Sequence, residues 1–109
     1  MKMKHIIAIS LVLILLLPYT VFAAATPTAS FKPNKTSGYA PLKVTFTYTG
    51  GSTKLVKWHM WNYGDGHTCR TCWHPSNTFT KPGKYKVSLT IKTAKGTSTK
   101  YSYITVKKR

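Results

Sequence analysis

The stretch Trp61-Asn62-Tyr63-Gly64-Asp65-Gly66 runs from an aromatic strand end into a tight turn, and it decides how the rest of the sequence is interpreted. Trp61 and Tyr63 are two positions apart, so both side chains lie on one face of an extended strand. Gly64 and Gly66 allow backbone conformations that a Cβ atom disfavours, and a carboxylate between them can accept hydrogen bonds from backbone N–H groups. Asp65 is the only acidic residue in the sequence, and we interpret it as the residue that fixes this turn.

Short β-type runs separated by turn residues extend from this stretch in both directions. Residues 42–48 and 85–91 alternate strictly between apolar and polar side chains, which is typical of half-buried strands. Further strands are expected at residues 29–31, 55–63, 77–80 and 97–107. About seven short strands with no helical period predict an all-β fold, an immunoglobulin-like antiparallel β-sandwich. Tyr85, which opens a late strand after Pro82-Gly83, fits the tyrosine corner of such sandwiches.

The strand before the turn contains an unusual pair of apolar side chains. If Trp61 and Tyr63 face the core, then Lys57 and His59 share their side, and Trp58 and Met60 face outward. Two interpretations are open. Either a bulge rotates part of this strand, or a loop, a second sheet edge or a ligand covers the outward patch.

The first 25 residues have the pattern of a secretory signal peptide. Two lysines precede an apolar run over residues 6–17, and Ala23 and Ala25 offer small residues for cleavage. The alternative is an uncleaved membrane anchor, for which the run up to Pro18 is short. We therefore expect residues 1–25 to be a signal peptide, residues 26–109 to form a single domain, and the product to be secreted or held at the cell surface.

The charge of the chain is strongly one-sided. It contains 17 Lys and Arg residues against one acid, and residues 26–109 keep a net charge of +14 because Lys2 and Lys4 leave with the signal peptide. Such a charge attracts polyanions and opposes compaction, but it says nothing about fold. The alternative is a generally basic surface that takes its counter-ions from the medium.

Several segments together resemble a known family of extracellular modules. The stretch at residues 61–66 resembles the W-D-F-G-D-G signature of PKD domains, which are immunoglobulin-like. Residues 29–31 and 37–46 are similar to the opening of that family, residues 82–91 to its P-G-x-Y-x-V-x-L-x-V segment, and residues 103–106 to its last strand. Asn62 replaces the usual Asp, and Asn77-Thr78-Phe79 stands where H-x-Y is common. The resemblance implies an extracellular, non-catalytic module for adhesion, spacing or carbohydrate contact.

The irregular segment after the turn, residues 67–74, leaves three chemical interpretations open. In an exported protein, Cys69 and Cys72 favour a disulfide, which would stiffen the turn. The same residues with His67 and His74 have the ligand types of a tetrahedral zinc site, with His59 as a substitute ligand. A redox-active C-x-x-C pair is the third interpretation, because Arg70 beside Cys69 could lower a thiol pKa.

The shortage of acids argues against enzymatic chemistry. A glycosidase of the usual type needs two carboxylates, and a Ser–His–Asp triad would have to take Asp65 from its turn. An oxygen-rich calcium site also needs more acids than the sequence has. We therefore predict no catalytic residues and no enzyme activity.

We expect a binding and adhesion module that associates with an extracellular polyanion, such as acidic cell-surface polysaccharide. The expected polyanion-binding residues are Lys43, Lys57, Lys84, Lys86, Lys92, Lys100, Trp58 and Trp73. The residues expected to define the fold are Trp61, Tyr63, Gly64, Asp65, Gly66, Pro82, Gly83 and Tyr85. No cofactor is expected, with zinc as the alternative.

Two other functions stay open. One is a small metal-binding or redox protein centred on His67, Cys69, Cys72 and His74, and the other is an extracellular nucleic-acid binder that uses the same lysines and aromatic residues. Other envelope proteins are candidate partners, and membrane contact is expected only through an uncleaved N-terminal segment.

Overall fold

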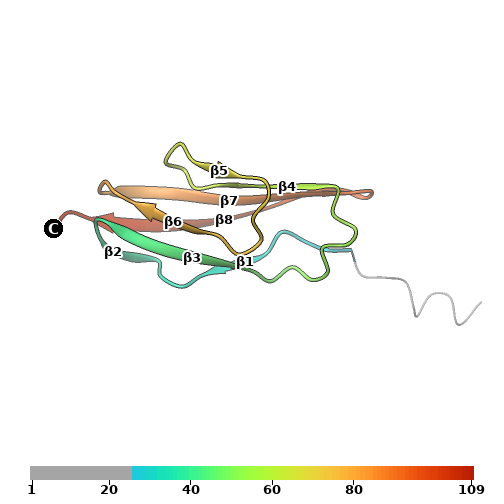
Figure 1. Ribbon diagram of the computed structural model, residues 1–109, viewed down its shortest axis with the longest axis horizontal. Coiled ribbons are helices and arrows are strands. Elements are labelled where there is room, and N and C mark those ends of the chain that lie inside the picture. The colour runs from blue at the N-terminus through green and yellow to red at the C-terminus, as the bar shows by residue number, and fades with distance from the viewer. Residues whose placement is uncertain (1–25) are drawn as a thin grey trace, which may run out of the picture.

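A computed structural model describes residues 26–109, and the predicted signal peptide lies outside these residues. The described part contains strands and turns but no helix, so no helix within it could cross a membrane. Eight strands form two sheets packed as a sandwich, which confirms the predicted all-β, immunoglobulin-like fold. Figure 1 shows the layers, with the long hairpin of β7 and β8 above β3, and the C-terminus at the opposite end from the start of the described chain.

The two sheets differ in size. The three-stranded sheet has the order β1 (Phe31–Pro33), β3 (Leu42–Tyr48), β6 (Ser76–Phe79). The five-stranded sheet has the order β2 (Ser37–Tyr39), β8 (Gly96–Lys107), β7 (Gly83–Thr93), β4 (Trp58–Asn62), β5 (Thr68–Cys69). Every pairing is antiparallel except that of β2 with β8, which is parallel. The sandwich is therefore antiparallel as predicted, with one parallel edge.

The core is built from the inward side chains of alternating strands. Trp61 on β4 is fully buried, and its ring packs edge-on against Phe31 with 4.9 Å between centroids. Phe46 lies 5.7 Å from the same indole and also contacts Tyr63. Trp61 thus joins the two sheets. The other buried apolar residues are Ala29, Leu42, Val44, Tyr48, Phe79, Val87, Leu89, Ile91, Ile104 and Val106.

The turn after β4 is held by the one carboxylate. Asp65 Oδ1 accepts a hydrogen bond from the His67 backbone N–H at 3.1 Å, and Oδ2 accepts one from Asn77 Nδ2 at 2.9 Å. Burial by itself would raise the pKa of Asp65, but these hydrogen bonds and the adjacent His67 ring outweigh burial and hold it below its ordinary value. The interpretation of Asp65 as a turn-fixing residue is confirmed.

Gly64 and Tyr85 complete the packing of the turns that follow β4 and β6. Gly64 has φ of 77°, and an added Cβ would lie 2.7 Å from the Lys86 carbonyl oxygen. At the start of β7, the Tyr85 hydroxyl donates a hydrogen bond to the Lys81 carbonyl at 2.6 Å, and its ring packs on Phe79. Tyr85 therefore forms the tyrosine corner that its position predicted.

The predicted strand at residues 55–63 begins later than expected, at Trp58, and Leu55 is exposed. Its register with β7 is regular from Trp58–Lys92 to Asn62–Ser88, so no bulge rotates the strand. His59 faces inward and is buried, as the alternation predicts, whereas Lys57 lies before the strand and is exposed. Trp58 remains on the outer face and is 42% exposed.

Candidate functional site

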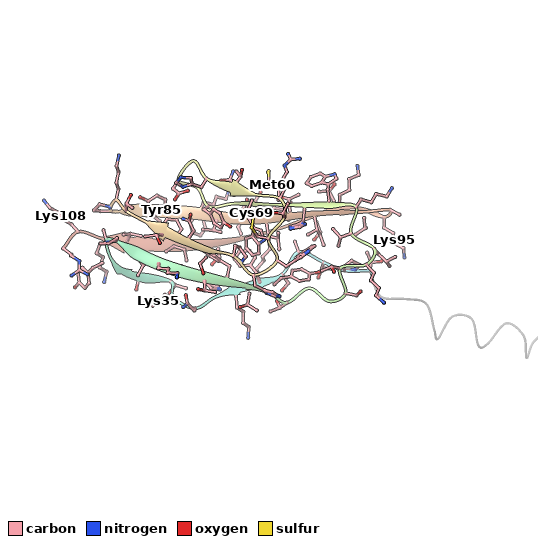
Figure 2. All side chains as sticks on the ribbon, viewed as in Figure 1. Lys35, Met60, Cys69, Tyr85, Lys95 and Lys108 are labelled. Atoms are coloured by element: carbon pink, nitrogen blue, oxygen red, sulfur yellow. A yellow bond between two sulfur atoms is a disulfide. The ribbon has the colours of Figure 1, made fainter. Side chains whose placement is uncertain are left out.

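The outer face of the five-stranded sheet gathers aromatic and basic side chains from four elements. Cross-strand register places Lys86 opposite Tyr103, and Trp58 opposite Lys92. Parallel pairing of β2 with β8 adds Tyr39 beside Lys107. The four aromatic side chains that are exposed among residues 26–109 all belong to this face, and they are Tyr39, Trp58, Tyr101 and Tyr103. Figure 2 shows Met60, on the outer face of β4, pointing to the upper side of the molecule.

A cation lies over each of these four rings. Lys86 Nζ lies 4.2 Å from the centroid of the Tyr101 ring, and Lys84 Nζ lies 4.9 Å from that of Tyr103. At the two ends of the face, the Arg70 guanidinium lies 5.9 Å from the Trp58 ring and Lys107 Nζ lies 6.0 Å from the Tyr39 ring. Each such cation–π pair is attractive by about 0.5–1 kcal/mol at exposed sites, so each ring helps to hold its cation above the sheet.

No carboxylate neutralises these cations. Asp65 is the only acidic residue, its oxygens accept hydrogen bonds from the His67 N–H and from Asn77, and Oδ1 lies 3.2 Å from His67 Nδ1. The lysines of the face therefore depend on anions from outside the domain. We define the lysine–tyrosine face as the set of outward side chains Tyr39, Trp58, Arg70, Lys84, Lys86, Lys92, Tyr101, Tyr103 and Lys107.

The residues predicted to bind polyanions are not all brought together. Lys84, Lys86, Lys92 and Trp58 lie on the lysine–tyrosine face. Lys43 belongs to β3 in the other sheet, and Lys57 precedes β4. Lys100 is opposite Leu89 and so is on the inward-facing side of β8, although its side chain is exposed.

Trp73 is not an open stacking surface. Its ring lies against the His59 imidazole with 3.7 Å between centroids and an angle of 21°, and it also contacts Tyr48 at 4.7 Å. It covers one edge of the core. Trp73 was expected to offer a flat stacking surface, and the direction of its side chain could not be inferred because it lies in an irregular segment with no alternation.

The cysteine loop is closed by a disulfide between Cys69 and Cys72, as favoured for an exported protein. The loop is tied to β4 through a single carbonyl group. Cys72 O accepts a hydrogen bond from Trp61 Nε1 and is also hydrogen-bonded to His59 Nε2, each at 2.8 Å. The disulfide thus holds the carbonyl that satisfies the buried indole N–H of the central core residue.

The alternative zinc ligands are not assembled. The two thiols are joined to each other, His67 faces Asp65, and His74 Nδ1 accepts a hydrogen bond from the Tyr48 backbone N–H at 3.2 Å. No group of three or more His, Cys, Asp or Glu side chains within residues 26–109 is arranged to hold a metal ion.

Five members of the lysine–tyrosine face were not predicted from the sequence: Tyr39, Arg70, Tyr101, Tyr103 and Lys107. The signal for two of them was present, because inward Ile104 and Val106 place Tyr101 and Tyr103 on the opposite face of the same strand. Tyr39 gave no such signal, since its three-residue strand reaches this sheet only through parallel pairing with β8.

Solved structures with this fold include PKD domains. The chain is similar to the PKD1 domain of the Vibrio cholerae metalloprotease PrtV, with 27% identity, a TM-score of 0.58 and coverage of 75% of this chain and 98% of that one. It is likewise similar to the PKD1 domain of Vibrio anguillarum Epp, with 25% identity, a TM-score of 0.60 and coverage of 80% of this chain and 100% of that one. None of the curated proteins matches the sequence.

A third solved structure shares the fold. It is a structure of carbohydrate-binding modules from the β-sandwich superfamily, with 22% identity, a TM-score of 0.64 and coverage of 79% of this chain but 36% of that chain. The family model of the PKD domain matches residues 24–107, which is nearly the whole of the described sandwich. The chain therefore belongs to the PKD domain family.

Proposed function

We propose that this protein is an exported, non-catalytic binding module whose lysine–tyrosine face binds an extracellular polyanion, an acidic cell-surface polysaccharide. The observation that carries the proposal is that the four exposed aromatic rings of residues 26–109 share one sheet face and that each lies under a Lys or Arg side chain. Family membership supports a binding or adhesion role in an extracellular or surface setting, and it leaves the ligand to be argued from this surface.

The arrangement favours a charged ligand over a neutral one. Because the ammonium groups of Lys84 and Lys86 occupy the exposed faces of Tyr103 and Tyr101, a neutral sugar ring could stack there only by displacing them. An anionic chain instead meets cations that are already held above the sheet and have no internal partner. Pre-organisation of this kind lowers the entropy lost by the side chains on binding.

The residue types indicate broad recognition of anionic polymers. Lys84, Lys86, Lys92 and Lys107 are point charges on flexible stems, and Arg70 is the one guanidinium on the face. Point charges attract carboxylate, sulfate and phosphate groups without imposing the planar two-point geometry of arginine. We therefore propose attraction to a class of acidic polymer, with no cofactor, since the cysteines are already paired.

The absence of catalysis is part of the proposal. Asp65 is the only acidic side chain in the sequence, so no second one can be paired with it. Both of its carboxylate oxygens already accept hydrogen bonds, from the His67 N–H and from Asn77. A mechanism that requires a pair of carboxylates cannot be assembled from these residues.

The test compares charge removal on two faces of the same domain. The variant K84Q/K86Q removes two charges from the lysine–tyrosine face, and K32Q/K43Q removes two exposed charges from the three-stranded sheet. Binding to heparin and to polygalacturonate is measured by titration at about 50 and 200 mM salt, a range over which polyanion binding weakens strongly. We expect K84Q/K86Q to lose about tenfold in affinity, about 1.4 kcal/mol, and the control to lose about two- to threefold.

Ring variants test the role of the tyrosines. Y101F/Y103F keeps both rings and should bind like the wild type, whereas Y101L/Y103L removes the ring faces and should bind several-fold more weakly. Equal losses for K84Q/K86Q and K32Q/K43Q would show that the attraction is diffuse and that the face is not a site. Salt-insensitive binding to neutral glycans would overturn the polyanion assignment, and a preference for single-stranded DNA over both polysaccharides would identify a nucleic-acid binder instead.

A further inference from the structure

One loop contains a sequence pattern that the proposed function does not use. Asn34-Lys35-Thr36 has the form N-x-S/T with a residue other than proline in the middle, which is the acceptor sequence for N-linked glycosylation of exported proteins. The other two asparagines do not have this pattern, because Asn62 is followed by Tyr-Gly and Asn77 by Thr-Phe. The pattern therefore occurs once in the chain.

The structure places this triplet at the surface, where a glycan attached to the asparagine would meet no part of the domain's core. All three residues are exposed and lie on the connection from β1 to β2, which crosses from one sheet to the other. Asn34 is held at its backbone and at its side-chain oxygen, since its N–H donates to Thr45 O and its Oδ1 accepts from the Thr45 N–H, both at 2.9 Å. These contacts leave the amide nitrogen Nδ2 as the part of the side chain that makes no protein hydrogen bond within residues 26–109.

Thr36, in contrast to Asn34, is held by its backbone alone. Its carbonyl oxygen accepts a hydrogen bond from the Thr105 N–H at 2.8 Å, which starts the pairing of β2 with β8, and its side chain is exposed. Replacing the Thr36 side chain should therefore leave the loop in place, which makes this position suitable for testing the acceptor pattern separately from folding.

We propose that Asn34 is an N-glycosylation site. The donor is an oligosaccharide joined through its anomeric carbon to a lipid phosphate or diphosphate, and the transfer is made by a membrane oligosaccharyltransferase during export. A bond forms between Asn34 Nδ2 and the anomeric carbon as the bond from that carbon to the phosphate oxygen breaks. The lipid phosphate leaves with the electron pair, the amide loses one proton to a base, and no oxidant or reductant is needed.

The position of the loop fits this modification. In Figure 2, Lys35 at the centre of the triplet points to the lower side of the molecule, and Met60 on the outer face of β4 points to the upper side. A glycan on Asn34 would thus lie away from the β4 part of the lysine–tyrosine face, whereas Tyr39, at the β2 end of that face, follows the triplet closely in the chain. The glycan would also stand beside β2, the edge strand of the five-stranded sheet, where a bulky hydrophilic group opposes edge-to-edge aggregation.

The test uses the full chain exported by the organism that makes it. Intact mass is measured before and after treatment with a peptide:N-glycosidase, which releases the glycan and converts the acceptor Asn to Asp. We expect an added oligosaccharide mass on the wild-type protein, its loss on treatment, and an Asp at position 34 in the peptide map. T36S keeps the acceptor pattern and should retain the added mass, whereas T36A should carry none.

Two results would overturn the proposal. One is an exported wild-type chain with the mass of the unmodified polypeptide, and the other is an N-glycan that persists in T36A. Urea unfolding of T36A and T36S made without glycosylation checks that both variants fold equally well. The outcome is separable from the polyanion proposal, because that binding is measured on unglycosylated protein.

Discussion

Replacing Gly64 with alanine should destabilise the domain more than the same change at Gly66, although both glycines have positive φ. Gly64 has φ of 77° and Gly66 has φ of 97°. A non-glycine residue in this left-handed region costs roughly 1–2 kcal/mol, and this cost is common to both variants. The positions differ in their surroundings, since an added Cβ at Gly66 meets no atom within 4 Å, whereas at Gly64 it would lie 2.7 Å from the oxygen and 3.1 Å from the nitrogen of Lys86.

The contact at Gly64 is with backbone, which cannot rotate away. Relieving it must move the corner away from β7, and overpacking of this kind costs typically about 1–3 kcal/mol. We therefore expect G66A to lower the free energy of unfolding by about 1–2 kcal/mol and G64A by about 2–5 kcal/mol. A domain whose stability lies above the lower end of the usual range of about 5–15 kcal/mol should still fold in both cases.

Urea unfolding followed by tryptophan fluorescence measures this difference, because Trp61 is fully buried in the native state. For a slope of about 1 kcal/mol/M, the midpoint of G64A should lie about 1–3 M below that of G66A, with the slope unchanged. If the two variants unfold at the same urea concentration, then the approach of the corner to β7 is not tight, and the requirement for glycine at Gly64 is one of backbone conformation alone.

Three further predictions concern groups described above. The pKa of Asp65 is lowered in the folded state, so its carboxylate stabilises the domain above about pH 4, and this contribution is lost as the pH falls through the folded-state pKa. The urea midpoint of D65N should therefore vary less between pH 7 and pH 3 than that of the wild type. Midpoints of the two proteins that change in parallel with pH would contradict the turn-fixing role. Burial first, and then the nearby Asp65 charge, raises the pKa of Tyr63 to about 12. Absorbance titration should therefore show one tyrosine ionising last, and the native state should lose stability as the pH rises above about 10. Loss of this late step in Y63F would assign it to Tyr63, and an unchanged titration in Y63F would refute the assignment. The variant C69S/C72S should lose about 2 kcal/mol of stability from the small closed loop, plus a contribution from the weaker hold on the Trp61 indole N–H, both measured as a shift in urea midpoint; a wild-type protein whose midpoint does not change on reduction would show that the loop stays docked without the disulfide.

Much of the fold could be predicted because the alternation of apolar residues is strict. Residues 42–48 and 85–91 gave their inward faces correctly, and inward Trp61 and Tyr63 followed from the two-residue period. The start of β4 was predicted too early because Leu55 and Val56 extend the apolar pattern into what is a turn in the structure. The local pattern does not reveal that β4 begins only at Trp58, which pairs with Lys92 near the point where β7 turns back into β8.

The candidate site was only half predictable for a related reason. Alternation identifies which side chains of a strand share a face, and it correctly assigned Lys84, Lys86 and Lys92 to one side of β7. It does not say which strands are neighbours, so Lys43 was grouped with residues that lie on the other sheet. Trp73, in a loop with no period, was expected at the surface and instead packs on His59.

The sequence by itself determined the class of fold, the turn at Asp65, the cysteine pairing expected in an exported protein, and the excess of positive charge. These follow from local spacing and from composition, which act over a few residues or over the chain as a whole. Only the tertiary structure decided that the cations and the exposed rings share one face, because that depends on which strands are neighbours in the sheet. The pairings of β2 with β8 and of β4 with β7 join residues distant in sequence, and together they place Tyr39, Trp58 and Tyr101 on the same side of the domain.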